Sequence, residues 1–252
     1  MSDDAYRVDF HVKILDHRVV SRAKRAGLDA IVYAPHFTRL PDARSRASLY
    51  ADDELAVIPA REVFTGTWRD RAHVLAFDLE EPIPDFITLD GAMAELERQD
   101  AVAFAPHPEF ATVSLDEVQL RTYRDQFDAV EVFNPKHLPA HNRRAAGLAE
   151  TLELPPFTSS YAHLGGTVGI AFTEFDGVGT VDELFEAIRA GEGRRVVYRN
   201  GLERLGKSAA EMAHLFWENS WQKIDRLFLS GTEPTNPRHV AYDGAFDDVA
   251  VY

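Results

Sequence analysis

Five histidines and one glutamate stand at the ends of short apolar segments between positions 11 and 163. These six candidate ligands are His11, His36, Glu62, His73, His107 and His163. Imidazole nitrogens and carboxylate oxygens are common ligands of zinc, manganese and iron in proteins. One such residue at each of several successive strand ends is hard to obtain by chance. The pattern therefore predicts a metal site whose ligands come from distant parts of the chain.

The composition is that of a globular protein with one large α/β domain. The chain has 252 residues, of which 45% are hydrophobic and 27% charged, and this is enough for a full core. It has no cysteine, which excludes disulfides and thiolate metal ligands. No apolar run approaches the roughly 18 residues of a membrane span, and the acidic start, residues 1–4, is unlike a signal peptide. We therefore expect a soluble, cytoplasmic protein without a membrane partner.

The charge balance is strongly acidic. The formal net charge is −14, and only five of the 27 basic residues are lysines. This composition resembles that of halophilic proteins, as in haloarchaea, and an ordinary acidic cytosolic protein is the alternative. An acidic surface repels nucleic acid phosphates at low salt, so nucleic acid is not expected as a partner. In molar salt the Debye length falls to about 3 Å, which weakens that argument.

Strand-like apolar segments alternate with helical segments along most of the chain. The segments expected as strands are 7–10, 30–33, 55–58, 73–77, 101–104, 129–133, 157–159, 168–172 and 195–198. The segments expected as helices are 18–26, 92–99, 115–127, 141–152 and 181–190. Repeated helix–strand units of this length predict a parallel sheet with helices outside it. With about seven such strands, a closed or nearly closed barrel is favoured over an open sheet.

A barrel would gather most of the six candidate ligands at one rim. In such barrels chemistry takes place at the C-terminal ends of the strands, and five of the six follow their strand. The exception is His73, which begins its apolar segment. A local reversal of that strand would bring His73 to the same rim.

The C-terminal part of the chain has a different pattern. Residues 209–229 are expected to form one long helix, with Trp217, Trp221, Ile224 and Phe228 on one face. Such a stripe indicates packing against the barrel or against a second subunit, which leaves a homo-oligomer open. No linker or composition break separates this part, so we expect a barrel over 1–205 and a helix and tail over 206–252 within the same domain.

The ordered series of motifs around these residues resembles the PHP family, the polymerase and histidinol phosphatase domains, over about residues 6 to 200. The segments that carry the resemblance are Asp9-Phe10-His11-Val12-Lys13, Ala34-Pro35-His36, Pro59-Ala60-Arg61-Glu62-Val63, His73-Val74-Leu75, Ala105-Pro106-His107-Pro108, Glu131-Val132-Phe133-Asn134 and Ser160-Tyr161-Ala162-His163. The resemblance implies a distorted, TIM-like (β/α)7 barrel that carries up to three divalent metals. It also implies a phosphoesterase activity.

The resemblance assigns the six candidate ligands to metals. One metal would be held by Glu62, His73 and His107. A second would be held by His36 and His163 together with Asp16 or His17, between which the sequence does not decide. Two metals per chain are therefore expected, and the ligand types suit zinc, manganese or iron.

The remaining metal site of the family pattern is altered. It keeps His11 and Glu62, but Lys13 stands in place of a histidine and Tyr161 in place of an aspartate. Because both losses fall on one metal, we interpret Lys13 as a fixed cation near Glu62 that could hold a phosphate oxygen. That hypothesis fails if Lys13 is beyond hydrogen-bonding distance of both Glu62 and any bound anion. Tyr161 could donate a hydrogen bond to the same anion.

These features predict a metal-dependent hydrolase of the PHP type whose substrate is a small anionic phosphate ester. Two metals would activate water, while Lys13 and Arg61 would help to bind the anion. Substrate specificity is expected in loops such as 38–50. The alternative is a catalytically degenerate barrel that serves as a binding or assembly module, which the altered metal site would explain.

Overall fold

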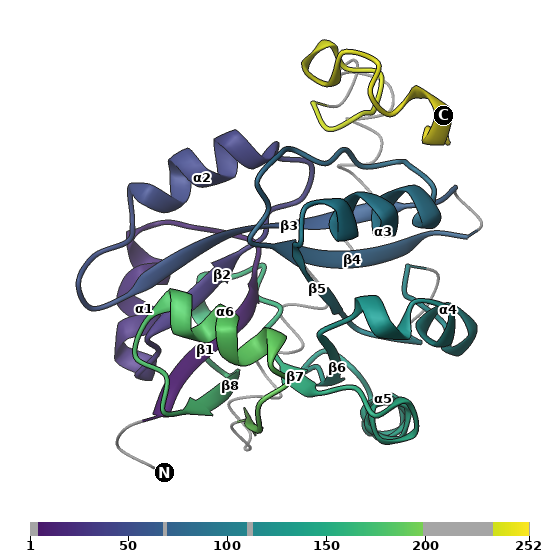
Figure 1. Cartoon of the computed structure of the whole chain (residues 1–252). Coiled ribbons are helices and arrows are strands. Elements are labelled where there is room, and N and C mark those ends of the chain that lie inside the picture. Colours follow the sequence, from purple (N-terminus) through teal and green to yellow (C-terminus); the bar gives the residue numbers. More distant parts are fainter. Residues whose placement is uncertain (1–4, 68–69, 110–112, 199–233, 252) are drawn as a thin grey trace.

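A computed structural model describes residues 5–67, 70–109, 113–198 and 234–251 of the chain. Within them a single sheet has the strand order β7-β6-β5-β4-β3-β2-β1-β8-β9, with helices around it (Figure 1). The strands are β1 (Ala5–Val12), β2 (Ala30–Tyr33), β3 (Ala56–Thr65), β4 (Ala72–Phe77), β5 (Val102–Ala105), β6 (Ala129–Phe133), β7 (Pro156–Thr158), β8 (Ala171–Asp176) and β9 (Arg194–Tyr198). The helices are α1 (His17–Ala26), α2 (Leu40–Ser48), α3 (Leu89–Arg98), α4 (Glu117–Thr122), α5 (Pro139–Leu152) and α6 (Val181–Arg189).

The sheet curls until its two ends approach each other. The Thr158 N–H of β7 donates to Thr173 Oγ1 of β8 at 3.0 Å, and that hydroxyl donates back to the Thr158 carbonyl at 3.1 Å. Beyond β7, a parallel bridge joins Ala162 to Val12 at the end of β1. These contacts nearly close the barrel, so the predicted distorted TIM-like barrel of the PHP type is confirmed.

The strand directions explain the distortion. β1, β2 and β3 are parallel, and so are β5, β6 and β7, but β4 is antiparallel to both of its neighbours. In the β3–β4 pair, His73 lies opposite Phe64, two residues beyond Glu62. The local reversal predicted for His73 is therefore confirmed. β8 also departs from the parallel pattern, because it is antiparallel to β1 and β9.

Phenylalanine rings fill the interior of the barrel. Phe10 is fully buried and lies 5.0 Å from Phe104, 5.9 Å from Phe77 and 5.9 Å from Phe157, between ring centroids. Successive residues of a regular strand point to opposite faces, yet the residue after Phe10, His11, reaches Glu62 inside the same barrel. An irregular register between Asp9 and Val12 accounts for this, because a bulge re-aims the residues that follow it.

Several segments differ from the sequence-based expectation. β3 continues to Thr65, beyond the expected 55–58, and β8 covers 171–176 in place of 168–172. Residues 38–50, expected as a loop, contain α2, which has a proline in its first turn and buries Leu40, Ala43 and Ala47 at helical spacing. The helix expected over 115–127 is shorter, because α4 ends at Thr122 and a 3-10 turn over Arg124–Gln126 follows.

The C-terminal segment is described only in part. The helix expected over 209–229 lies outside the described residues. Residues 234–251 run beside the connection between β4 and α3, where the Asp85 N–H donates to the Thr235 carbonyl and the Thr88 N–H to the Val249 carbonyl, both at 2.8 Å. That the whole chain forms one domain stays a prediction. In the described residues no helix combines the length and apolar character needed to span a membrane.

The phenylalanine core makes Phe10 a sensitive position. Phe10→Ala would leave a cavity among the interior rings, so we expect the free energy of unfolding to fall by about 3–5 kcal/mol. Denaturant unfolding followed by circular dichroism measures this change. Leu49→Ala is the control, because Leu49 is 77% exposed and its loss should change stability by no more than about 0.5 kcal/mol. A cost for Phe10→Ala as small as that of the control would contradict the interior placement.

Candidate metal centre

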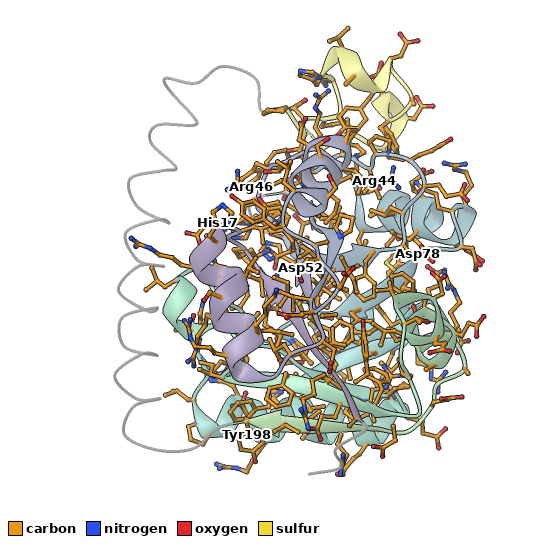
Figure 2. All side chains as sticks on the ribbon, turned by 90° about the vertical axis from the view of Figure 1, so that its left-hand side faces the viewer. His17, Arg44, Arg46, Asp52, Asp78 and Tyr198 are labelled. Carbon is orange, nitrogen blue, oxygen red and sulfur yellow. The ribbon has the colours of Figure 1, made fainter. Side chains whose placement is uncertain are left out.

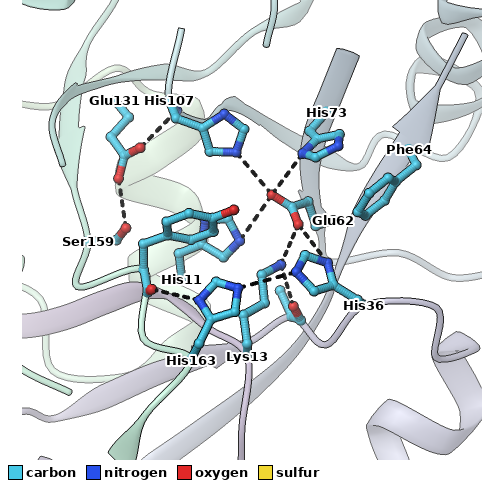
Figure 3. A network of polar contacts seen from close by, with 12 residues as sticks. His11, Lys13, His36, Glu62, Phe64, His73, His107, Glu131, Ser159 and His163 are labelled. Atoms are coloured by element: carbon cyan, nitrogen blue, oxygen red, sulfur yellow. Dashed lines mark hydrogen bonds and ion pairs between the residues drawn. The ribbon is translucent and has the colours of Figure 1, made fainter. Parts of the chain in front are cut away.

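One buried carboxylate, that of Glu62 at the C-terminal part of β3, is the centre of the candidate site (Figure 3). Three histidines converge on its Oε1 atom. His107 Nε2 lies 3.1 Å away, His73 Nδ1 3.3 Å away and His11 Nε2 3.4 Å away. They come from three separate parts of the barrel rim: the loop after β5, the start of β4 and the end of β1. Strand closure and the reversal of β4 therefore bring together residues that are far apart in sequence.

The other oxygen of Glu62 has a different environment. Its Oε2 atom lies 2.6 Å from Lys13 Nζ and 3.1 Å from His36 Nδ1. Lys13 is buried and also donates to the Ala34 carbonyl at 2.7 Å. The lysine is therefore within hydrogen-bonding distance of Glu62, which is the condition set for its role as a fixed cation.

Beyond His36 the network continues to a second buried lysine. His36 Nε2 lies 3.4 Å from His163 Nε2, and His163 Nδ1 lies 2.7 Å from Lys136 Nζ and 3.1 Å from the Tyr161 carbonyl. Sequence reasoning missed Lys136, because a lysine in a loop is usually on the surface. Its position two residues after Asn134 of the motif series was the signal available.

Tyr161 contacts both lysines. Its ring centroid is 4.2 Å from Lys136 Nζ and 5.9 Å from Lys13 Nζ, within the range of cation–π contact. The ring also lies 4.6 Å from that of His11. Tyr161 has φ 47°, a left-handed conformation that costs free energy in a bulky residue. The backbone thus holds this ring against both cations at some energetic cost.

Pairing with β1 places the loop that carries Tyr161 and His163. The Lys13 N–H donates to the Ala162 carbonyl at 2.9 Å, and the Ala162 N–H donates to the His11 carbonyl at 3.1 Å. Asp9, buried in β1, accepts the Ser160 N–H at 2.9 Å. Burial raises the pKa of Asp9 to about 6, against the lowering effect of these hydrogen bonds.

A second buried carboxylate, Glu131 of β6, holds His107 in place. The His107 N–H donates to Glu131 Oε2 at 2.8 Å, and Asn134 Nδ2 donates to the same oxygen at 3.0 Å. Ser159 Oγ donates to Glu131 Oε1 at 2.7 Å. His107 has φ 34°, so its backbone needs this fixation to keep a conformation that non-glycine residues rarely adopt.

Burial and neighbouring charges shift the pKa of several groups at the centre toward their metal-binding forms. Burial opposes ionisation of Glu62, but Lys13 and the surrounding histidines outweigh it and hold the pKa of the carboxyl well below its usual range. Burial and Lys13 lower the pKa of His11, and they lower that of His36 to about 3. Burial and Lys136 likewise lower the pKa of His163. An anionic carboxylate and neutral imidazoles are the forms that bind divalent metals.

The residues around Glu62 Oε1 fit a metal ion. Ligand atoms of Glu62, His73 and His107 all lie within 4.8 Å of one another. Both ring nitrogens of His11 and of His73 are buried without a hydrogen-bond partner among the described residues, because their short distances to Glu62 lack hydrogen-bond alignment. Buried polar atoms are normally satisfied, so these nitrogens indicate a ligand that is neither side chain nor backbone.

Two of the residues predicted as metal ligands are directed elsewhere. Asp16 is exposed and caps α1, where it accepts the Val19 N–H at 2.8 Å. His17 is exposed (Figure 2). It packs against Tyr50, with 5.1 Å between ring centroids. Among the described residues, the group with metal-ligand spacing is Glu62, His73 and His107. His36 and His163 therefore gain no third ligand from Asp16 or His17.

Arg61 also points away from the centre. It is fully buried, pairs with Asp85 at 2.8 Å and donates to the Thr38 carbonyl. Neighbouring residues of a strand face opposite sides of the sheet, so Glu62 inside the barrel requires Arg61 outside it. The expectation that Arg61 binds a substrate anion does not agree with this placement.

A cavity lies beside Lys13, between the loop after β1 and α2. Its volume is about 730 Å³, and its lining includes Lys13, Asp16, Tyr33, Thr38 and Arg46. The segment 38–50, expected to govern specificity, thus forms one wall of a cavity that has Lys13 in another.

Comparison with known families finds a match over part of the chain. Residues 139–192 match the PHP-associated family. This stretch begins with α5, includes Tyr161 and His163, and ends just after α6. Among curated protein sequences, none is significantly similar to the chain.

Solved structures share the fold. PsfC from Pseudomonas syringae PB-5123 superposes with a TM-score of 0.64 at 22% identity, over 84% of this chain and 99% of that one. A protein of Bifidobacterium adolescentis, named as a candidate metal-dependent phosphoesterase, has a TM-score of 0.53 at 14% identity, over 73% and 96%. Endonuclease Q, bound to a 27-mer duplex with an abasic lesion at its active site, has a TM-score of 0.52 at 15% identity, over 76% and 58%. The expectation that nucleic acid is not a partner gains no support from this last likeness.

The placement of Arg61 predicts a structural role. Arg61→Met would leave the Asp85 carboxylate buried and unpaired, so we expect the free energy of unfolding to fall by about 3–5 kcal/mol. The double variant Arg61→Met/Asp85→Asn, which removes the charge but keeps an acceptor for the Phe64 N–H, should recover part of this loss. Denaturant unfolding of the three proteins gives both numbers. An Arg61→Met protein of unchanged stability would contradict the assignment.

The contacts of Glu131 predict an effect on metal affinity. Glu131→Gln keeps the size of the side chain but removes one acceptor oxygen from the group that holds His107. Loss of such an outer partner typically weakens metal binding about 10–100-fold. Competition of the folded protein with a chelator for zinc measures the affinity. Glu117→Gln, on exposed α4, serves as the control, and equal affinities of the two variants would refute the positioning role of Glu131.

Proposed function

We propose that the chain is a metal-dependent hydrolase of the PHP type that acts on a small phosphate ester. The observation that carries the proposal is the convergence of His11, His73 and His107 on one oxygen of a buried, ionised glutamate. A barrel without a metal would have no need for orphaned imidazole nitrogens in its interior.

Glu62, His73 and His107 would hold the metal, with His11 beside them. When bound, the ion would polarise the phosphoryl oxygen and lower the pKa of a water molecule. This set of imidazole and carboxylate donors suits zinc, manganese or iron. Lys13 keeps Glu62 ionised and, as a buried ammonium, could hold an oxygen of the anionic substrate. The hydroxyl of Tyr161 could donate to the same anion.

The proposed number of metals differs from the number expected from the sequence. Two metals per chain were expected, with the second on His36, His163 and either Asp16 or His17. Because Asp16 caps a helix and His17 packs on Tyr50, we propose one tightly bound metal per chain, at Glu62.

The substrate class is a separate question from the metal. A small phosphate ester is favoured by the acidic net charge of −14, because an acidic surface repels a long polyanion. The fold is shared with a candidate metal-dependent phosphoesterase and with endonuclease Q, so both a monoester and a DNA duplex belong among the substrates tested. The cavity lined by Lys13 and α2 is the place where we propose that the alcohol part of the ester is selected.

The alternative is a degenerate barrel that binds or assembles without catalysis. Its basis is the pair of departures from the family pattern at Lys13 and Tyr161. Such a module should be purified without metal, and it should take up no zinc or manganese with high affinity. Elemental analysis of tag-free protein by mass spectrometry separates the two proposals before any substrate is known.

Activity is expected to depend on Glu62. Zinc- or manganese-loaded protein should hydrolyse p-nitrophenyl phosphate, and a chelator should abolish the reaction. Glu62→Gln should lower the rate by more than about 100-fold, because loss of an outer partner alone costs 10–100-fold. Glu54→Gln is the control, since Glu54 is 76% exposed and lies in a surface ion pair with Lys24.

The assay is run at low and at molar potassium chloride, because the composition resembles that of halophilic proteins. A DNA duplex is tested alongside the monoester. Hydrolysis that survives both the chelator and Glu62→Gln would refute the proposal. Absence of turnover with every metal and ester would leave the binding module.

A further inference from the structure

Two buried lysines flank His36 and His163, the pair to which the resemblance assigned a second metal. Lys13 lies against Glu62 Oε2, and Lys136 lies against His163 at the other end of the same network. We propose that Lys13 and Lys136 replace the second metal and together form a binding subsite for the phosphoryl group of the substrate. This inference rests on the proposed function, which it deepens by naming the residues that hold the anion.

The direction of the hydrogen bonds in this half leaves no lone pair for a metal. An ammonium group only donates, so His163 Nδ1 accepts from Lys136 at 2.7 Å. The proton of a neutral His163 is then on Nε2, which faces His36 Nε2 at 3.4 Å. His36 accepts there, and its own proton is on Nδ1, which faces Glu62 Oε2 at 3.1 Å. Each ring has one donor and one acceptor nitrogen, so both lone pairs face a donor, while the buried His36 Nδ1 lies near Glu62 without a regular hydrogen bond.

The contact with Lys136 determines which nitrogen of His163 carries the proton, and therefore whether His163 can bind a metal. His163 Nδ1 is also 3.1 Å from the Tyr161 carbonyl, to which it could donate if it carried the proton. His163 Nε2 would then offer a lone pair, as metal-bound histidines usually do when the other nitrogen donates to a carbonyl. The contact with the ammonium is the shorter one, at 2.7 Å. With Lys136 in place, His163 is therefore turned away from metal binding.

The charges favour an anionic ligand over a second metal. The two ammonium groups lie 4.2 and 5.9 Å from the centroid of one ring, that of Tyr161, so both border the same ring. Together with a divalent ion at Glu62 they exceed the charge of that single carboxylate. Another cation between His36 and His163 would meet repulsion from both lysines, whereas a phosphate group, nearly doubly charged at neutral pH, would be attracted.

Hydrogen bonds fix the positions of the two lysines. The Lys136 N–H donates to Asn134 Oδ1 at 3.0 Å, which holds the loop after β6. The Lys13 ammonium donates to the Ala34 carbonyl at the end of β2. Lysine binds phosphate as a point charge rather than through a rigid fork. We therefore assign the subsite to a phosphate monoester and not to a neutral ester.

The first part of the test is the metal content of the natural chain. Protein saturated with zinc or with manganese, then desalted and analysed by elemental mass spectrometry, should retain one ion per chain. Two retained ions per chain would overturn the inference, because the second would have to occupy the half that holds the lysines.

The second part measures binding of inorganic phosphate to the metal-loaded protein by calorimetry. Lys136→Met should weaken phosphate binding about tenfold or more, because a charge-assisted hydrogen bond is lost. Lys136→Arg, which keeps the charge, should retain more of the affinity. Lys24→Met is the control, because Lys24 pairs with Asp52 and Glu54 on the surface and its loss should leave phosphate binding within twofold.

Folding is checked on each variant by thermal unfolding. An affinity of folded Lys136→Met within twofold of the natural protein would overturn the inference. If Lys136→Met does not fold, the comparison of Lys136→Arg with Lys24→Met and the metal count of the natural chain decide it. Phosphate binding that depends on Lys136 without any ester turnover would refute the proposed function and leave the subsite standing. Ester turnover together with a phosphate affinity independent of Lys136 would refute the subsite and leave the proposed function standing.

Discussion

The buried negative charge of Glu62 is the constraint on which the rest of the site depends. A carboxylate removed from water is costly unless cations or hydrogen-bond donors surround it. Lys13 lies 2.6 Å from one oxygen, and histidines lie 3.1 to 3.4 Å from both. Lys13 keeps the carboxyl ionised without help from a metal, so the ligand is in its binding form before any ion arrives.

Surrounding one carboxylate from every side demands a closed and irregular barrel. A purely parallel sheet would leave the start of β4, and with it His73, at the opposite rim from Glu62. The bulge in β1 lets Phe10 fill the interior while the next residue, His11, reaches the rim. Left-handed backbone at His107 and Tyr161 completes the arrangement. Strain of this kind persists only where the surrounding structure enforces it, and the aromatic interior and the Glu131 network provide that support.

Strand ends made the central ligands predictable from sequence. A parallel barrel gathers its C-terminal strand ends at one rim, so the apolar segment before each histidine located His11, His36 and His107 beside Glu62. His73 required only the further step of reversing its strand. Side chains whose roles depend on local geometry were harder to predict. Asp16 precedes an amphipathic helix, and a helix cap and a metal ligand are chemically alike until the backbone is known.

The sequence did not reveal how deeply a side chain is buried or on which face of the sheet it lies. Arg61 adjoins Glu62 and looked like an anion ligand, but strand alternation sends it to Asp85 on the other side of the sheet. Lys136 follows a strand in a loop, and only its position two residues after Asn134 indicated that it could be as little as 8% exposed. The third strand and α2 were underestimated for a related reason, since a short apolar run marks only the most buried part of an element.

The two oxygens of Glu62 face two different kinds of cation. Oε1 faces His11, His73 and His107, which suits an ion that polarises substrate and water. Oε2 faces Lys13, whose ammonium can attract an anion but cannot lower the pKa of a bound water as a metal does. Exchange of a metal for lysines would therefore preserve the charge that binds phosphate while leaving water activation to the ion at Oε1. The contact of the Tyr161 ring with both lysines favours a joint replacement over independent decay, because the residues of the altered half touch one another.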